Sequence, residues 1–202
     1  TNYALIVWDH GGGLSGTSWD DSAGGDNLKL AEFRSAVLAS NLPHFDFIGF
    51  DACLQGMLEQ CWDLRDLTDV MVASQELEPG DGWEYQSFLG ALAADPAMSA
   101  FDFANAVVDA YGERYAGESD TTLSAIRTAG LDALNQSLNT FAATVMEVGP
   151  GLLPGLRAAA QHATRLGPSD LDYRDLGDFM QEVVDTSGNS AVRAVLPAWL
   201  PC

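Results

Sequence analysis

The sequence is poor in positive charge. Only 9 of its 202 residues are Lys or Arg, against 29 Asp and Glu, so the formal net charge is −20 at pH 7. A protein that binds nucleic acid needs a basic face to neutralise phosphates, and anionic membrane surfaces also attract basic segments. We therefore expect neither nucleic acid nor a membrane as a partner. The acidity is compatible with solubility, a high-salt habitat or a cationic ligand.

Long apolar runs are missing as well. No stretch of about 18 uncharged apolar residues occurs, so the sequence predicts no transmembrane helix. The sequence predicts no signal peptide within it either, and it enters an apolar run directly after Thr1 and Asn2. We expect that it begins inside a larger precursor or after an omitted segment.

Cysteine is scarce. The three cysteines, Cys53, Cys61 and Cys202, are too few and odd in number for a disulfide framework. No Cys-x-x-Cys or His-Glu-x-x-His spacing indicates zinc. Cys61 lies in an apolar helical segment and is predicted to be a buried core residue. The partner of Cys202, and with it the redox compartment, stays open.

The sequence does contain an alternation of short apolar runs with helical segments. Strands are predicted at residues 3–8, 45–50, 69–74 and 121–127. Helices are predicted at residues 28–40, 54–65, 84–94, 99–116, 130–147, 152–165, 173–186 and 189–199. Residues 11–27 are rich in Gly, Ser and Asp without a period, and are predicted to form a long loop.

This alternation predicts an α/β fold with a mostly parallel sheet covered by helices. The continuous apolar run at residues 3–8 is typical of a strand buried on both faces. We expect a core at residues 1–128 and a helical C-terminal region at residues 129–202 packed on it.

Three predicted strands end in reactive residues. These ends are Asp9-His10-Gly11, Asp51-Ala52-Cys53 and Ser74-Gln75-Glu76. Ligands of parallel sheets bind at the carboxyl ends of the strands, so the three ends are expected to converge on one site.

His10 and Cys53 together suggest nucleophilic catalysis. An imidazole serves as acid or base near neutral pH, and a thiolate is favoured at a helix N-terminus, which is predicted just after Cys53. Alone, His10 is equally compatible with a hydrogen-bonded strand end and Cys53 with a small core residue. His44 is interpreted as structural and His162 as a surface residue of a C-terminal helix.

The glycines that follow His10 match a dinucleotide fingerprint by spacing, Gly11-x-Gly13-x-x-Gly16. That motif needs a helix opening within it and an acid about 20 residues on, and neither is predicted here. No Gly-Lys-Ser/Thr phosphate loop occurs. The glycines fit better with close approach of a substrate backbone, with an N–H there as oxyanion donor.

Two acids have two interpretations each. Asp51 either faces a pocket and binds a cation or caps the following helix, and Asp81 in "EPGDGW" has the same alternatives. The turn residues around Asp81, with Trp83 and Tyr85, are suited to wall a substrate pocket.

Five blocks of the sequence resemble, in order, the signatures of the clostripain-like cysteine peptidases, within the caspase, gingipain and legumain group. They span residues 2–180 and read "NYALIVWDHGGG", "FIGFDACLQGMLE", "VASQELEPGDGWEY", "TLSAI" and "YRDLGDFM". The resemblance implies a caspase-like fold and a dyad of His10 as the catalytic histidine and Cys53 as the nucleophile. It also implies an oxyanion hole formed by the N–H groups of Gly11 and Cys53.

The same resemblance implies specificity for Arg or Lys before the scissile bond. Asp51 matches the acid at the base of the S1 pocket, and Asp81 matches a second acid of its wall. Ser74, Gln75 and Trp83 are further candidates for the pocket wall.

The chain departs from this family in three ways. Two sheet strands that precede the histidine strand in relatives are absent, which predicts an exposed apolar edge and association with a missing N-terminal segment or chain. Residues 11–28 contain no Lys or Arg, so the usual self-cleavage in that loop is not expected. Some relatives need calcium; Asp20, Asp21 and Asp26 are candidate ligands but match no recognised loop.

The sequence therefore predicts a cysteine endopeptidase that cleaves after basic residues, Arg over Lys, and requires no cofactor. The alternative is a catalytically silent relative that binds peptides or proteins. A secreted or cell-envelope bacterial protein is expected in either case.

Overall fold

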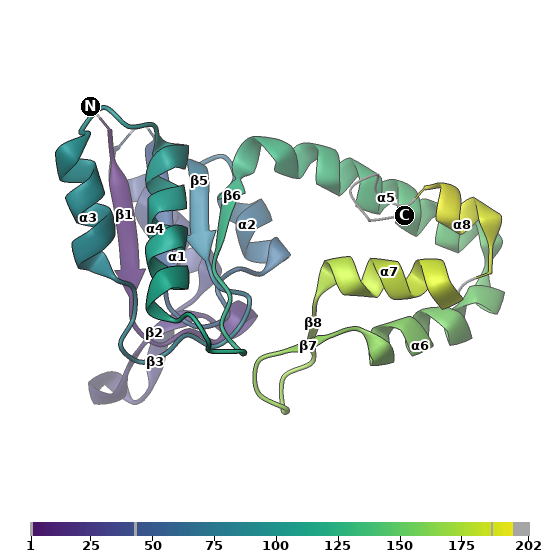
Figure 1. Ribbon diagram of the computed structural model, residues 1–202. Helices are drawn as coiled ribbons and strands as arrows, with labels where there is room; N and C mark the ends of the chain where they lie inside the picture. Colours follow the sequence, from purple (N-terminus) through teal and green to yellow (C-terminus); the bar gives the residue numbers. More distant parts are fainter. Residues whose placement is uncertain (1, 43, 187, 196–202) are drawn as a thin grey trace. The chain divides into compact units, whose positions relative to one another are not determined.

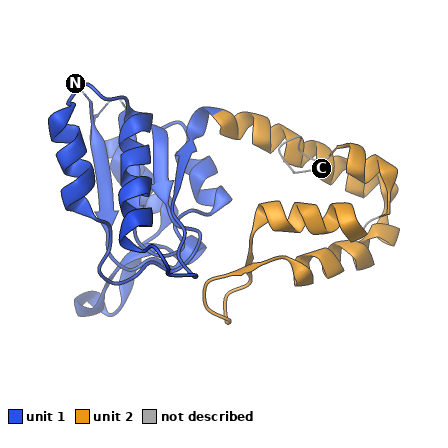
Figure 2. Ribbon diagram, in the orientation of Figure 1, with its two compact units in different colours: residues 1–129 blue, residues 130–202 orange. Residues whose placement is uncertain are grey.

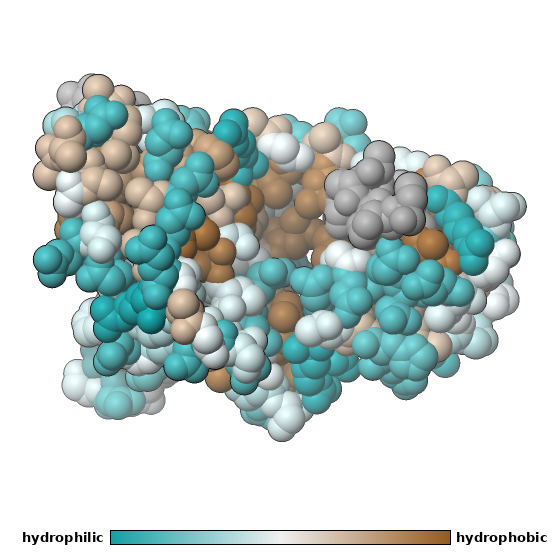
Figure 3. All heavy atoms as spheres, viewed as in Figure 1, coloured by the Kyte–Doolittle hydropathy of each residue, from teal (hydrophilic) through white to brown (hydrophobic). Residues whose placement is uncertain are grey.

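The computed structural model describes residues 2–42, 44–186 and 188–195. The chain divides into two compact units, Thr1–Ala129 and Gly130–Cys202 (Figure 2). Hydrophilic side chains cover much of the face shown in Figure 3, as the excess of acids leads one to expect. Cys202 lies outside the described residues, as do the last residues of the helix predicted at 189–199.

The first unit is built on a mixed four-stranded sheet (Figure 1). Its order is β1-β4-β5-β6, with strands β1 (Ala4–Trp8), β4 (Phe45–Asp51), β5 (Thr68–Ala73) and β6 (Ser124–Arg127). The first three strands are parallel and β6 is antiparallel to β5. The predicted α/β fold with a mostly parallel sheet is confirmed.

Helices cover both faces of this sheet. On one face, side chains of α3 (Tyr85–Ala94) and α4 (Ala100–Arg114) pack with Phe47 of β4 in one apolar cluster. On the other face, Phe33 of α1 (Leu30–Ala39) packs on Phe50 with ring centroids 5.2 Å apart. Because Phe47 and Phe50 point to opposite faces, β4 is buried on both. The short helix α2 (Leu58–Leu64) contributes the buried Cys61.

The prediction that the first strand is buried on both faces is wrong. β1 is an edge strand whose pairing in the described residues is with β4, and its Ala4 and Trp8 are exposed. An apolar run has the same pattern at an edge and in the centre of a sheet, so the sequence could not distinguish the two positions. The exposed apolar edge that the family resemblance predicts is present at β1.

The long loop predicted at residues 11–27 is partly ordered. It contains the 3₁₀ turns η1 (Gly13–Ser15) and η2 (Asp21–Ala23) and an antiparallel pair of β2 (Thr17–Asp20) and β3 (Asp26–Leu28). The prediction of an irregular segment is wrong because strands of three or four residues are too short to show a period of two.

The second unit is mainly helical and has its own apolar core. Its elements are α5 (Leu131–Val148), η4 (Pro150–Leu152), α6 (Leu153–His162), β7 (Arg165–Leu166), β8 (Tyr173–Arg174), α7 (Leu176–Thr186) and α8 (Ser190–Ala194), after η3 (Thr128–Gly130). The sequence did not predict the short β7–β8 pair. The predicted packing of these helices on the core stays a prediction. No helix among the described residues has the length and apolarity to span a bilayer.

Candidate active site

The site forms where β1 and β4 end. In their parallel register Trp8 pairs with Asp51, and the N–H of Asp9 donates to the carbonyl oxygen of Asp51 at 3.4 Å. His10 and Cys53 follow these pairs by two residues and line one cavity of about 270 Å³. The complete lining is Trp8, Asp9, His10, Asp51, Ala52, Cys53, Glu78, Pro79, Gly80 and Gly82. The structure thus brings the two reactive residues of the sequence prediction to one cavity.

Cys53 sits in a tight turn between β4 and α2. The next residue, Leu54, has φ 62°, a left-handed conformation that non-glycine residues rarely adopt. The turn is bonded to the segment after β5. Leu54 N–H donates to the carbonyl oxygen of Glu76 at 3.0 Å, and Gly56 N–H donates to the carbonyl oxygen of Ser74 at 2.7 Å. This anchoring holds the strained turn, and with it the half-buried thiol, in place.

The expected helix N-terminus is not beside Cys53. α2 begins at Leu58 rather than at residue 54, so the prediction of its start is wrong. The charge effect of a helix end fades within one turn. In its place, the N–H of Glu78 donates to Cys53 Sγ at 3.2 Å, and Sγ lies 3.8 Å from the carbonyl oxygen of Glu78. The contacts that fix the sulfur therefore come from the segment after β5 rather than from a helix end.

Gly11 is required for the two strand ends to meet. A Cβ at this position would lie 2.0 Å from the carbonyl oxygen of Cys53 and 2.9 Å from Gln55 Nε2. The loop is fixed on its other side as well, because the carbonyl oxygen of His10 accepts hydrogen bonds from Ser18 N–H at 2.9 Å and Thr17 Oγ1 at 3.0 Å. The backbone of His10 is therefore placed, whereas its side chain is exposed to solvent.

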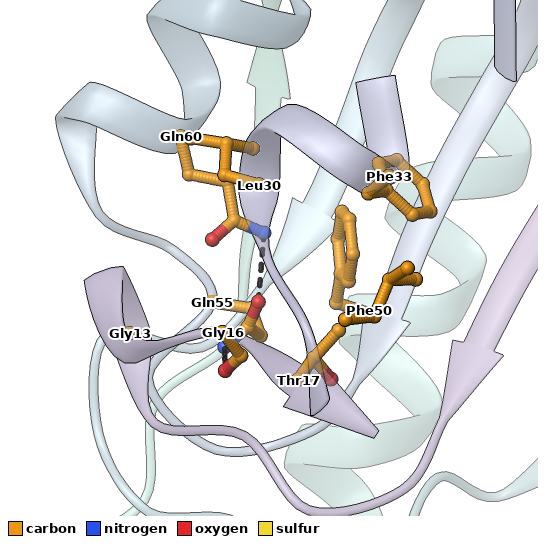
Figure 4. Close-up of a pocket in the computed structure, with 9 residues that line it drawn as sticks. Gly13, Gly16, Thr17, Leu30, Phe33, Phe50, Gln55 and Gln60 are labelled. Atoms are coloured by element: carbon orange, nitrogen blue, oxygen red, sulfur yellow. Dashed lines mark hydrogen bonds between the residues drawn. The ribbon is translucent and has the colours of Figure 1, made fainter. Parts of the chain in front are cut away.

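Two buried amides, which the sequence analysis missed, join these loops (Figure 4). Gln55 Nε2 donates to the carbonyl oxygens of Gly16 and Cys53, each at 3.3 Å, and Gln55 Oε1 accepts from Gln60 Nε2 at 2.9 Å. Both side chains are buried. The two glutamines just before and within α2 were the available signal, because buried amides must find partners.

Asp51 lies at the floor of the cavity. It is 3% exposed, and its Oδ2 accepts from the Tyr85 hydroxyl at 2.8 Å and from Trp83 N–H at 3.1 Å. Burial and the hydrogen bond to Asp51 raise the pKa of Tyr85, so the hydroxyl stays a donor. Asp51 does not cap the following helix, whose N-cap is Met57. Of its two interpretations, the carboxylate that faces a pocket fits the structure.

Glu78 is a second carboxyl in this cavity, and the sequence analysis did not select it. Its Oε2 accepts from Trp83 Nε1 at 3.1 Å, while its Oε1 is buried and has no hydrogen-bond partner among the described residues. Burial, and then the charge of Asp51, raise the pKa of Glu78 to about 9. Glu78 is therefore neutral at pH 7.

The other predicted pocket residues do not line the cavity. Asp81 points to solvent, with 82% of its side chain exposed, and its Oδ2 is 3.3 Å from Arg114. Ser74 is buried and bonds to Thr122 at 3.0 Å. Gln75 follows it and is half-buried, and Trp83 belongs to the apolar cluster and reaches the site through its N–H groups. The cavity lining given above includes none of these four residues.

The remaining candidates lie apart from the cavity lining. Burial raises the pKa of the Cys61 thiol to about 12, which keeps it unreactive. His44 contacts Asp69 at 3.0 Å and His162 contacts Glu182 at 3.4 Å.

The three calcium candidates lie on the β2–β3 pair and on the turn η2 between the two strands. Asp20 accepts hydrogen bonds from the N–H groups of Ser22 and Ala23, at 2.8 Å and 3.3 Å. In the part of the chain that the structure describes, no group of three His, Cys, Asp or Glu residues is arranged to hold a metal ion.

Comparison with known proteins identifies solved structures of similar fold. A secreted C11 cysteine protease from Bacteroides thetaiotaomicron, solved with an irreversible peptide inhibitor, is 25% identical with a TM-score of 0.72. The match covers 96% of this chain and 53% of that one. An inactive zymogen C11 protease from Parabacteroides distasonis is 20% identical with a TM-score of 0.68, over 96% of this chain and 52% of that one.

This chain thus spans about half the length of these relatives. A search of curated proteins found no match. A family model of the clostripain family matches residues 1–191. The chain belongs to the clostripain family.

Proposed function

We propose that this protein is a cysteine endopeptidase that cleaves peptide bonds after basic residues, Arg over Lys. The observation that carries the proposal is one cavity lined by His10, Cys53 and the buried carboxylate of Asp51. The family assignment and an inhibitor-bound relative that is a cysteine protease support this class of activity. Since two relatives are described as secreted, we extend the proposal to a secreted bacterial protein.

In the proposed reaction, the Cys53 thiolate attacks the carbonyl carbon before the scissile bond. The N–H groups of Gly11 and Cys53 stabilise the oxyanion, and His10 protonates the leaving amine. Before the attack, His10 accepts the proton of the Cys53 thiol. Water, deprotonated by His10, then hydrolyses the acyl-enzyme and restores the thiol.

Specificity in this proposal comes from Asp51. A buried carboxylate held by Tyr85 and Trp83 is fixed in position, so a guanidinium or ammonium that enters the cavity meets it without further ordering. Asp81 is exposed and paired with Arg114, so the proposal for the cavity floor rests on Asp51.

A reporter peptide that ends in Arg tests the proposal, with the citrulline peptide as an uncharged control. We expect cleavage of the Arg peptide, loss of cleavage in Cys53→Ala, and retention in Cys61→Ala, which removes a buried thiol. Asp51→Asn should raise the KM for Arg and remove the preference over citrulline. An arginyl chloromethyl ketone should alkylate Cys53.

Full activity in Cys53→Ala would exclude the proposed mechanism. Tight binding of the Arg peptide by a folded protein that does not cleave it would instead favour the second interpretation, a silent family member that binds peptides.

A further inference from the structure

The cavity contains a carboxyl group that the proposed reaction does not use. Glu78 lines the cavity together with Asp51, and Trp83 donates hydrogen bonds to both carboxyls. Among the described residues, Glu78 Oε1 is buried without a hydrogen-bond partner. Two carboxylates in a desolvated site repel each other strongly, so one of them keeps a proton. A proton on Glu78 relieves this repulsion.

The position of Glu78 suits a ligand-binding group. Trp83 Nε1 donates to Oε2 at 3.1 Å, so the carboxyl is held at the cavity wall. Its backbone meanwhile contacts the sulfur of Cys53. The residue therefore lies between the cavity floor and the reacting atom, where the side chain before a scissile bond would run.

We propose that Glu78 is a specificity-determining residue that ionises when a cationic side chain enters the cavity, so that binding the cation releases one proton to the solvent. In the empty cavity Glu78 is neutral and Asp51 carries the charge. A guanidinium or ammonium takes the place of the proton between the two carboxyls, and both then face it as carboxylates. This inference rests on the proposed specificity for basic residues.

The pH dependence follows from this exchange. Because the pKa of Glu78 is raised to about 9 in the empty cavity, a proton must leave before the cation gains its second partner. Affinity for a cation therefore rises with pH between pH 7 and about 8.5, by up to about tenfold per pH unit, and levels off above the raised pKa.

Other titratable groups face the same space. Asp9, His10, Asp51 and Cys53 line the cavity with Glu78. The Tyr85 hydroxyl donates to Asp51, and the Tyr111 hydroxyl interacts electrostatically with Glu78; burial raises the pKa of both tyrosines, so they stay neutral. All six remain in a Glu78 variant, so the difference between that variant and the native protein isolates Glu78.

The test uses n-propylguanidine, a permanent cation that is not cleaved, and calorimetry at pH 7.5 in phosphate and in Tris. The dependence of the binding heat on buffer ionisation gives the number of protons released, expected to be about one for the native protein. This measurement needs no variant. Binding to Glu78→Gln should release no proton, and the Kd of this variant for n-propylguanidine should change little between pH 7 and 8.5. The native protein should therefore bind n-propylguanidine progressively more tightly than the variant as the pH rises.

Glu76→Gln is the matched control, because it makes the same substitution in the same segment at a residue outside the cavity lining. It should retain the proton release and the pH dependence of the native protein. Binding without proton release, together with an unchanged pH profile in Glu78→Gln, would overturn the role of Glu78 and leave Asp51 and the proposed function in place. Absence of n-propylguanidine binding and of Arg-peptide cleavage would overturn both.

Discussion

Strands β1 and β4 are neighbours in the sheet, yet they differ in burial. β4 lies inside the sheet, and six of its seven residues are buried. β1 lies at the edge; its central residues are half-buried, and Trp8 at its end is 68% exposed. Position in the sheet, rather than the apolar run itself, decides which strand is core.

The ends of these two strands also differ in how firmly they hold the residues of the site. The end of β4 carries Asp51 and Cys53, and hydrogen bonds from several segments hold both. The end of β1 carries His10, whose side chain is exposed. A rigid element thus presents the proposed nucleophile and the proposed cation-binding carboxylate, while an edge element presents the proposed acid–base group. The geometry between them depends on the contact at Gly11.

The largest expected effect is therefore that of Gly11→Ala. The added methyl group would overlap the carbonyl oxygen of Cys53, so the two strand ends must separate. A misplacement of about 1 Å in a catalytic pair costs on the order of 100-fold in rate. We expect kcat/KM for the Arg peptide to fall by at least about 100-fold, measured by steady-state kinetics.

Gly90→Ala provides the control, because its helical position on α3 has nothing within 4 Å of the added Cβ. It should retain activity. Activity close to native in Gly11→Ala would show that the two strand ends do not need the close contact seen here.

The second effect concerns stability and uses register partners on the two strands. Ile48 is fully buried in β4, and Leu5, directly opposite in β1, is half-buried. Ile48→Ala should lower the free energy of unfolding by about 3 kcal/mol, since it leaves a core cavity. Leu5→Ala should lower it by about 1 kcal/mol, because less apolar surface is lost from a half-buried site.

Urea unfolding followed by tryptophan fluorescence measures both changes. Equal losses for the two variants would mean that β1 is packed as tightly as β4 in solution, and would remove the contrast between edge and centre.

The sequence was sufficient to predict the parts of the site that follow regular strands. His10, Asp51 and Cys53 each stand within two residues of a strand end, and parallel strands bring such ends together whatever the details of the loops. The alternation of strands and helices also predicted the layered fold. These features depend on local periodicity and on general rules of sheet topology, both of which a single sequence carries.

These rules do not predict the conformations of the loops. Asp81 and Glu78 are acids of one turn-rich segment, three residues apart, and only the path of the backbone decides that Glu78 enters the cavity while Asp81 points to solvent. The start of α2 was misplaced for a similar reason. Leu54 adopts a left-handed conformation because long-range hydrogen bonds anchor the turn, and helix propensity contains no information about such contacts.

The smallest expected effect concerns the exposed end of β1 and rests on the proposed specificity. Trp8 lines the cavity but remains 68% exposed, so Trp8→Ala should change the free energy of unfolding by no more than about 0.5 kcal/mol. An indole face beside a bound guanidinium contributes about 0.5–1 kcal/mol at an exposed site, so KM for the Arg peptide should rise about two- to fivefold. Trp8→Phe, which keeps an aromatic face, should recover part of that loss. If Trp8→Ala instead destabilised the protein by about 3 kcal/mol, as a core position does, the end of β1 would be packed like β4, and the division between a rigid strand and an edge strand would not hold.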